Sequence, residues 1–432
     1  MTNRLILSIF FVGILLLNAC TDDTEPNPTP ETKPNILLII ADDMGVDATP
    51  GYNIGSMKPI MPHLQALMNE GLTFDNAWTN PICAPTRSAI LTGKYGYRTG
   101  VLNANDLSTI STSEKTLQAY LDDNNLGYNH AIIGKWHLSN DGNTPTQMGI
   151  NHYAGIVSGA IQNYYDWDIF QDGNSTSTTE YATEKLTNLA IDWIGEQDDS
   201  WFCWLAYNTP HTPFHLPPSG THSQGNLSTN QATIDANPMP YFLAMMENMD
   251  HEIGRLFDSM TEAEKENTII IFIGDNGTTR SVRQLPYLPK SSKGSLYQGG
   301  VHVPMVVSGK NVSRAGEREA ALVNSTDLFI TIANLAGLNV ETYQDSYNFA
   351  HLLTASGSGN RNYNYTDITN TISGYTIRDE QYKLIVNDNG VEEFFNLSAD
   401  SYETNDLLQN ALTVAEQTAK TALETEAASI RQ

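Results

Sequence analysis

Residues 35–43 read Asn-Ile-Leu-Leu-Ile-Ile-Ala-Asp-Asp, an apolar run that ends in two aspartates. A strand that is apolar at every position is typical of a parallel sheet covered on both faces. Further apolar runs, interpreted as buried parallel strands, span residues 130–133, 201–207, 268–274 and 303–308. Helical patterns lie between the strands at residues 61–70, 88–91, 116–123, 180–195, 241–260 and 327–336. This alternation predicts an α/β fold with a large mixed, mostly parallel sheet sandwiched by helices.

The character of the chain changes beyond residue 345. Short antiparallel strands are predicted at residues 375–379, 382–386 and 393–397, and a closing helix at residues 408–430. We therefore expect one large domain over residues 34–345. A smaller C-terminal α+β subdomain, an antiparallel sheet plus a helix, is expected over residues 346–432.

The charge balance of the chain restricts its partners. The 432 residues include 49 acidic and 23 basic side chains, which gives a formal net charge of -26. Nucleic acids and anionic membrane surfaces are bound through an excess of Lys and Arg, so we expect no nucleic acid partner. The composition does not exclude a small anionic ligand, because a local group of Lys and Arg side chains can make its binding site positive.

The first twenty residues have the pattern of a targeting segment. Arg4 precedes the apolar run 5–17, which is short for a membrane span and leads into Leu17-Asn18-Ala19-Cys20. Residues 1–20 thus resemble a bacterial lipoprotein signal peptide, with Cys20 as the lipidated (palmitate-carrying) residue. The alternative interpretation is an ordinary cleaved signal peptide in which the cysteine is incidental. Residues 21–33 predict a disordered acidic tether, so we expect an exported lipoprotein anchored to the outer membrane, at its periplasmic face or at the cell surface.

Two polar pairs follow strongly apolar strands. Asp42 and Asp43 end the run at 35–41, and Asp275 and Asn276 end the run at 268–274. The carboxyl ends of parallel strands form the ligand crevice of an open α/β sheet, so these pairs should meet there. A donor set made of oxygens alone selects Ca2+, with Mg2+ as second choice, over zinc. Each pair taken alone is equally consistent with a simple turn.

The segment Cys83-Ala84-Pro85-Thr86-Arg87 lies where a loop enters a helix. Proline suits the first helical turn, and Cys83 and Arg87 are four residues apart, which puts them on one helical face. A reactive side chain, a guanidinium and a helix N-terminus would then point at one anion. The competing interpretation is a buried cysteine beside a capping proline. The third cysteine, Cys203, lies in an apolar strand and is interpreted as a small core residue, so no disulfide framework follows.

Three further clusters carry histidine or lysine. Lys135 and His137 follow the strand at 130–133 and point the same way in an extended chain. His211 lies in a proline-stiffened loop after the strand at 201–207, and Lys293 lies in a glycine-rich segment. His215, in the same loop as His211, is interpreted as loop structure rather than as a functional residue.

Together the five clusters, in this order, resemble the type I sulfatases of the alkaline phosphatase superfamily, over residue 33 to the C-terminus. The resemblance implies that Cys83 is converted to formylglycine (3-oxoalanine) by a maturation enzyme. It implies one Ca2+ held by Asp42, Asp43, Asp275, Asn276 and the modified Cys83. The catalytic positions it implies are Cys83, Arg87, Lys135, His137, His211 and Lys293.

The chain departs from the family pattern at two positions. The family has Glu before the paired glycines and Arg two residues after them, where this chain has Gln298 and His302. This puts local hydrogen bonding and subsite specificity in doubt. The di-zinc branches of the superfamily have an Asp-His pair where this chain has Asp275-Asn276, which argues against a phosphatase.

The resemblance implies a sulfuric ester hydrolase that acts on a sulfated carbohydrate. We expect Arg87, Lys135 and Lys293 to neutralise the sulfuryl oxygens, while His211 with Lys293 protonates the leaving oxygen and His137 accepts a proton. A polysaccharide of a marine alga is the first candidate substrate, because the acidic, Lys-poor composition suits a salty habitat. Arylsulfatase or glycosaminoglycan sulfatase activity is the alternative. A non-catalytic surface lipoprotein that binds sulfated glycan is the alternative from another class, and the aromatic stretch 164–167 offers a stacking surface.

Overall fold

The computed structural model describes residues 33–105, 109–171, 173–370 and 373–432. The predicted signal peptide with Cys20, and the predicted tether up to residue 32, lie outside the described residues. Within the described ranges, no helix is long and apolar enough to cross a membrane.

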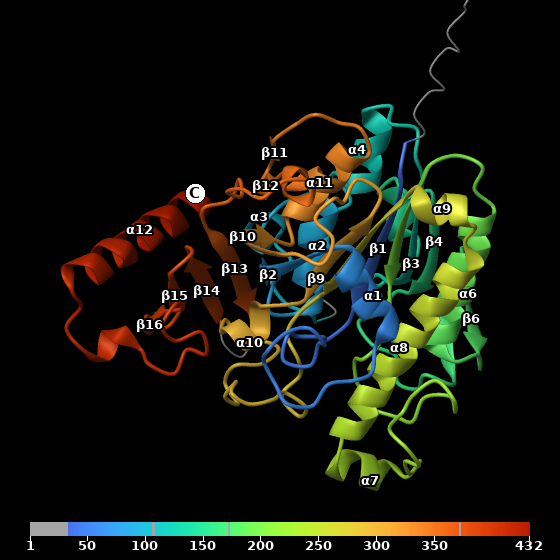
Figure 1. Cartoon of the computed structure of the whole chain (residues 1–432), viewed down its shortest axis with the longest axis horizontal. Coiled ribbons are helices and arrows are strands. Elements are labelled where there is room, and N and C mark those ends of the chain that lie inside the picture. Colours follow the sequence, from blue (N-terminus) through green and yellow to red (C-terminus); the bar gives the residue numbers. More distant parts are fainter. Residues whose placement is uncertain (1–32, 106–108, 172, 371–372) are drawn as a thin grey trace, which may run out of the picture. The chain divides into compact units, whose positions relative to one another are not determined.

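A large sheet forms the centre of the described residues and has ten strands there (Figure 1). In spatial order they are β10 (Arg318–Asn324), β2 (Leu72–Trp78), β9 (Met305–Gly309), β8 (Thr268–Gly274), β1 (Asn35–Ala41), β7 (Trp201–Ala206), β3 (Asn129–Lys135), β4 (His152–Ile156), β5 (Trp167–Gln171) and β6 (Asn174–Thr178). From β8 to β4 every neighbouring pair is parallel. The predicted α/β class with a mixed, mostly parallel sheet is confirmed.

One strand runs in the opposite direction to its prediction. The segment at 303–308 was expected to be parallel, but β9 pairs antiparallel with both β8 and β2. Both faces of β9 are covered, so Met305, Val306 and Val307 are all buried and apolar, and an apolar run carries no information on strand direction.

Helices cover both faces of the sheet (Figure 1). In β1, Leu37 and Ile39 pack toward one face, with α1 (Pro62–Glu70), α6 (Ala182–Gly195) and α8 (Met239–Ser259). Ile36, Leu38 and Ile40 pack toward the other, with α2 (Cys83–Thr92), α4 (Leu117–Asp123) and α11 (Asp327–Leu335). Both sets in β1 are fully buried, which explains the unbroken apolar run. Shorter helices are α3 (Gly96–Thr99), α5 (Thr144–Gln147), α7 (Gln231–Ala236), α9 (Glu262–Glu266) and α10 (Gln298–Val301).

The C-terminal part forms a second, antiparallel sheet with one helix, as predicted. Its strands are β13 (Asn364–Thr369), β14 (Ser373–Arg378), β15 (Tyr382–Asn387) and β16 (Glu392–Asn396), in that spatial order. Helix α12 (Val414–Ile430) packs Leu423 and Ala427 against Ile377 and Leu384 of this sheet. A hairpin of β11 (Thr342–Tyr343) and β12 (Ser346–Tyr347) and a 3-10 turn (Ala350–Leu353) precede it.

The closing helix begins later than the predicted residue 408. Residues Leu407–Gln409 form only a 3-10 turn, and α12 starts after Thr413. The Thr413 hydroxyl accepts from the Glu416 backbone N–H, and the Glu416 carboxylate accepts from the Thr413 N–H at 2.7 Å. This capping box fixes residue 414 as the beginning of the helix, and the prediction from the sequence missed it.

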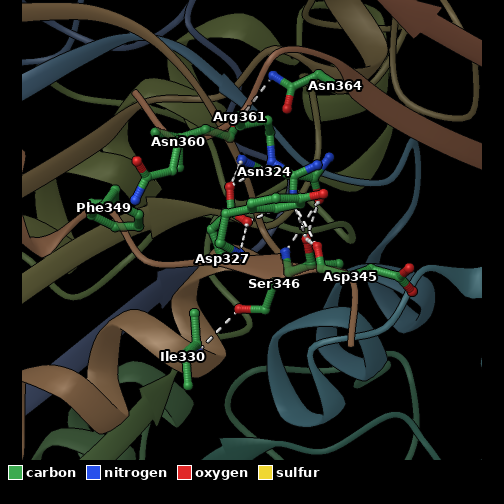
Figure 2. Close-up of polar contacts among 12 residues, drawn as sticks. Asn324, Asp327, Ile330, Asp345, Ser346, Phe349, Asn360, Arg361 and Asn364 are labelled. Atoms are coloured by element: carbon green, nitrogen blue, oxygen red, sulfur yellow. Dashed lines mark hydrogen bonds and ion pairs between the residues drawn. The ribbon is translucent and has the colours of Figure 1, made fainter. Parts of the chain in front are cut away.

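A buried ion pair joins the segment before β13 to the large sheet. Figure 2 shows the Arg361 side chain pointing at the carboxylate of Asp327, the first residue of α11. Nε of Arg361 donates to Oδ2 of Asp327 at 2.7 Å and Nη2 donates to Oδ1 at 2.5 Å. The same carboxylate accepts the backbone N–H groups of Asn324 and Tyr347. Both charged side chains are at most 3% exposed, so the attraction between them has to offset the cost of removing each charge from water.

Replacement of Arg361 tests this ion pair. Arg361→Met leaves the Asp327 carboxylate buried without its counter-ion, and we expect a loss of about 3–5 kcal/mol in the free energy of unfolding. Urea denaturation followed by circular dichroism measures it. Lys265→Met, which removes an exposed pair on α9, is the matched control and should leave the midpoint unchanged. Equal midpoints for both variants would show that the Arg361 pair contributes nothing.

Candidate active site

The two predicted polar pairs meet at the carboxyl ends of β1 and β8. These strands are parallel neighbours whose last residues, Ala41 and Gly274, lie in register. The Asp43 backbone N–H therefore donates to Oδ1 of Asp275 at 3.1 Å, and Nδ2 of Asn276 donates to Oδ1 of Asp43 at 2.9 Å. All four of these residues are buried, with at most 1% of each residue exposed.

Three cations from separate elements neutralise the three carboxylates. Nζ of Lys135, at the end of β3, lies 2.6 Å from Oδ2 of Asp42. Nη2 of Arg87, in α2, lies 2.8 Å from Oδ2 of Asp275, while its Nη1 donates to the Lys135 carbonyl. Nζ of Lys293 lies 2.5 Å from Oδ1 of Asp43. The formal charges of the six side chains balance.

The pKa values of Asp42 and Asp43 are shifted in opposite directions. Burial, together with the nearby Asp275, raises the pKa of Asp42 well above its ordinary value, although Lys135 opposes this. Burial alone would also raise the pKa of Asp43, but Lys293 and His211 outweigh it and hold that pKa below its ordinary value. The Asp42 carboxylate is thus less well compensated by positive charge than the Asp43 carboxylate.

Cys83 is the first residue of α2 and is 2% exposed. Its Sγ lies 3.3 Å from Nδ1 of His137. Nε2 of His137 lies 3.2 Å from the Ala104 carbonyl, so the neutral ring carries its proton on Nε2 and presents a lone pair to Cys83. Burial, with Lys135 and Arg87 nearby, lowers the pKa of His137 to about 2, which keeps the ring neutral at pH 7.

His211 lies on the other side of Asp43. Its Nδ1 donates to the Thr212 carbonyl at 2.7 Å, and its Nε2 lies 3.9 Å from Oδ2 of Asp43. Burial lowers the pKa of His211 to about 3; Asp43 favours the charged ring, but Lys293 opposes it. The hydroxyl of Tyr164 donates to the carbonyls of Asn208 and His211, which fixes the loop.

Two residues of the site have left-handed backbone. Asp43 has φ 70° and His137 has φ 56°. This region is uncommon for residues other than glycine and is concentrated at functional sites. Asp43 lies two residues after the end of β1, and His137 lies two residues after the end of β3.

The donor set fits a hard divalent cation. Oδ1 of Asp42 and Oδ1 of Asn276 are buried oxygens without a hydrogen-bond partner in the described part of the chain. Ligand atoms of Asp42, Cys83 and Asp275 lie within 4.8 Å of one another. Buried acceptors of this kind are normally satisfied, and oxygen donors suit Ca2+ and Mg2+. A divalent cation here would also leave the balanced site with a net positive charge.

The structure connects the Lys293 segment to the C-terminal sheet, which the sequence did not reveal. Oε1 of Gln298 accepts from Nε1 of Trp78 at 2.9 Å, and the Gln298 backbone N–H donates to Oε2 of Glu403 at 2.6 Å. The buried Lys383 lies 2.5 Å from Glu403 and 4.8 Å from the centre of the Trp78 ring. Neither Glu403 nor Lys383 stands in a motif, so no local pattern could have identified them.

The cluster of carboxylates, cations and Cys83 does not include His302, His215 or Cys203. Burial lowers the pKa of His302 to about 4, and its Nε2 donates to the Asp75 carbonyl at 2.8 Å. His215 packs on Tyr164 with ring centres 4.2 Å apart and accepts from the Tyr181 hydroxyl, in agreement with a loop-structure role. Cys203 is fully buried in β7, as expected for a core residue.

The fold and the site define a class of hydrolase that binds an anionic ester at the carboxyl ends of parallel strands, beside a metal-binding oxygen cluster. The sequence model of the family described as Sulfatase matches residues 34–338, and that described as N-sulphoglucosamine sulphohydrolase, C-terminal, matches residues 291–429. The chain therefore belongs to the sulfatase family of the alkaline phosphatase superfamily. The expectation of a sulfuric ester hydrolase is confirmed at the level of the family.

Individual relatives are distant. The uncharacterized sulfatase YdeN of Escherichia coli is 26% identical over 376 residues, which cover 74% of this chain and 66% of that protein. The ulvan-active sulfatase of Formosa agariphila is 26% identical over 408 residues, 87% of this chain and 77% of that protein. The crystal structure of Ps i-CgsB in complex with k-i-k-neocarrahexaose has a TM-score of 0.79 at 24% identity, covering 93% of this chain and 94% of that one. This last likeness shows the fold alone.

Calcium addition tests the oxygen cluster. A ligand at 100 times its Kd stabilises the folded state by about 2.7 kcal/mol, so we expect Ca2+ to raise the thermal midpoint and excess chelator to lower it. Mg2+ should raise it less, because the cluster offers more oxygens than Mg2+ usually takes from protein. Asp42→Asn should abolish the Ca2+ shift, while the exposed Asp199→Asn keeps it. A full shift in Asp42→Asn would exclude Asp42 as a ligand.

Proposed function

We propose that this chain hydrolyses sulfate esters of a sulfated polysaccharide or its oligosaccharides, with a marine algal polysaccharide as the first candidate. The observation that carries the proposal is the convergence of Cys83, three cations and an oxygen cluster on one point at the carboxyl ends of the strands. The ulvan-active relative and the acidic composition support the algal candidate. Glycosaminoglycans and aryl sulfates are the alternatives.

Two groups beyond the encoded side chains belong to this proposal. Asp42, Asp43, Asp275, Asn276 and the modified Cys83 would hold Ca2+, whose charge offsets that of the sulfuryl oxygens. Formylglycine made from Cys83 by a maturation enzyme supplies, as its hydrate, a hydroxyl nucleophile. The position of Cys83 at the first residue of α2, beside His137 and the oxygen cluster, is compatible with both.

The cations bind and orient the ester. Lys293 is the least buried of the three, with 19% of its side chain exposed, and therefore lies nearest the entrance. Arg87 and Lys135 lie deeper, at 1% or less, and are fixed by Asp275 and Asp42. Pre-oriented charges in a buried site stabilise developing negative charge without reorganisation.

The two histidines have opposite roles in proton transfer. His137 is neutral and presents the Nδ1 lone pair toward residue 83, so it accepts a proton from a group at that position. His211 presents Nε2 toward Asp43 and Lys293 and is neutral before the ester binds. The negative charge of a bound sulfate ester raises the pKa of His211, and His211 with Lys293 then donates a proton to the leaving oxygen.

A substrate panel tests the proposed activity. Protein purified from its native host should release sulfate from algal oligosaccharides, such as those of carrageenan, faster than from glycosaminoglycan disaccharides or an aryl sulfate. Cys83→Ala should lower the rate by at least about 10³-fold, because no other nucleophile takes its place. Mass spectrometry of the peptide that contains residue 83 provides the control. An unmodified thiol and no sulfate release from any compound would favour the non-catalytic glycan binder.

We also propose that the chain is exported and anchored to the outer membrane through a lipid on Cys20. The apolar run 5–17, followed by Leu17-Asn18-Ala19-Cys20, supports this. Cys20→Ser should lose labelling by palmitate and move from the membrane fraction to the soluble fraction, whereas Cys83→Ala should keep both. Unchanged labelling and fractionation of Cys20→Ser would contradict the anchor.

A further inference from the structure

A cavity of about 480 Å³ lies beside the candidate active site, between the end of β4 and the start of β5. Its volume is in the range of about 300–1,000 Å³ that is usual for small-ligand sites. Residues that line it include Val157, Ser158, Gln162, Asp166, Trp167 and Asp168. None of these residues belongs to the metal, cysteine or cation clusters.

The segment that lines the cavity also contacts both candidate catalytic histidines. The His137 backbone N–H donates to the carbonyl of Val157 at 3.1 Å. Gly159 faces the His137 ring so closely that a Cβ there would lie 2.2 Å from Nε2, which only glycine avoids. At its other end, the segment reaches Tyr164, whose hydroxyl donates to the His211 carbonyl at 2.7 Å. The wall of the cavity therefore lies next to His137, and the same segment is tied through Tyr164 to the loop that carries His211.

The charge of the cavity is opposite to that of the site beside it. Asp166 and Asp168 line it, and its lining in the described residues contains no Lys, Arg or His. Oδ1 of Asp168 accepts from the Ser177 hydroxyl across the β5–β6 pair at 2.6 Å, which orients the carboxylate. The Asp166 carboxylate has no hydrogen bond or ion pair within the described ranges, so both of its oxygens are available to a ligand.

The rest of the lining suits a sugar ring. The half-buried Val157 and Phe170 provide apolar surface, and Ser158 and Gln162 provide hydroxyl and amide groups. Apolar surface packs on the C–H faces of a pyranose, while carboxylates accept hydrogen bonds from its hydroxyls. A second sulfate or a uronate carboxylate would instead meet two negative charges in the cavity, and juxtaposed like charges weaken binding.

We propose that this cavity binds an uncharged, unsulfated sugar unit next to the unit that bears the cleavable sulfate. Asp166 and Asp168 then act as specificity-determining residues that reject a neighbouring unit with a sulfate or carboxylate. This inference rests on the proposed function, because the cavity receives a sugar only if the adjoining site holds a sulfated carbohydrate. The chain thus selects sparsely charged segments of its polymer.

The test compares two oligosaccharides that carry the same cleavable sulfate. In one, the neighbouring unit is uncharged; in the other, that unit carries a second sulfate. We expect kcat/KM of the full-length enzyme to be at least about tenfold higher for the first, mainly through KM. The double variant Asp166→Asn/Asp168→Asn should reduce this ratio toward one, and Asp166→Lys should reverse it. Asp199→Asn, an exposed acidic position before β7, is the matched control and keeps the ratio.

A binding measurement separates failure of this inference from failure of the proposed function. Calorimetry with the Cys83→Ala protein and the same two oligosaccharides requires no turnover, and should give at least about tenfold weaker binding for the disulfated compound. Equal affinities, or tighter binding of the disulfated compound, would overturn the inference while sulfate release by the wild type leaves the proposed function intact. Binding of neither oligosaccharide, together with no sulfate release from either by the wild type, would overturn both.

Discussion

Mutual neutralisation of six charges at the strand ends, five of them buried, is the constraint on which the site depends. Three carboxylates at the ends of β1 and β8 are almost fully buried, and a buried carboxylate without a partner costs several kcal/mol. Their partners, Lys135, Arg87 and Lys293, come from β3, α2 and the segment before α10. Each ion pair therefore fixes one more element around the strand ends. Because the formal charges balance, a divalent cation makes the site attractive to an anion.

The C-terminal sheet contributes to the site although it supplies none of the candidate catalytic residues. Glu403 and Lys383 form a buried pair whose carboxylate also accepts the Gln298 backbone N–H, at the start of α10. Five residues earlier, Lys293 contacts Asp43. The Arg361–Asp327 pair provides a second attachment. The small sheet thus holds the entrance of the site in place through charge pairs and through a shared apolar cluster, in which Leu296 and Tyr297 pack with Ile368, Ile385 and Phe395.

Prediction from the sequence worked best where a single physical property decided the outcome. The runs that became β1, β7 and β8 are buried on both faces, so unbroken apolarity identified them. β2 and β13 mix buried polar residues with apolar ones, and neither was predicted. In β13 the polar Asn364 is buried because it donates to the carbonyls of Val323 and Asn76, partners that no local pattern reveals. The direction of β9 was predicted wrongly, because strand direction depends on how distant segments are connected and not on the local sequence.

The sequence by itself determined which chemical groups are present: a cysteine at the start of a helix, oxygens after two apolar strands, three cations and two histidines. Side-chain chemistry and local periodicity are properties of short segments, so they can be read from the chain directly. Only the tertiary structure decided the pairing, since Arg87 and Asp275 are 188 positions apart and Asp43 and Asn276 are 233 apart. It also decided the tautomers of the two histidines and the acidic cavity beside them, because both depend on backbone carbonyls and side chains from separate strands and loops.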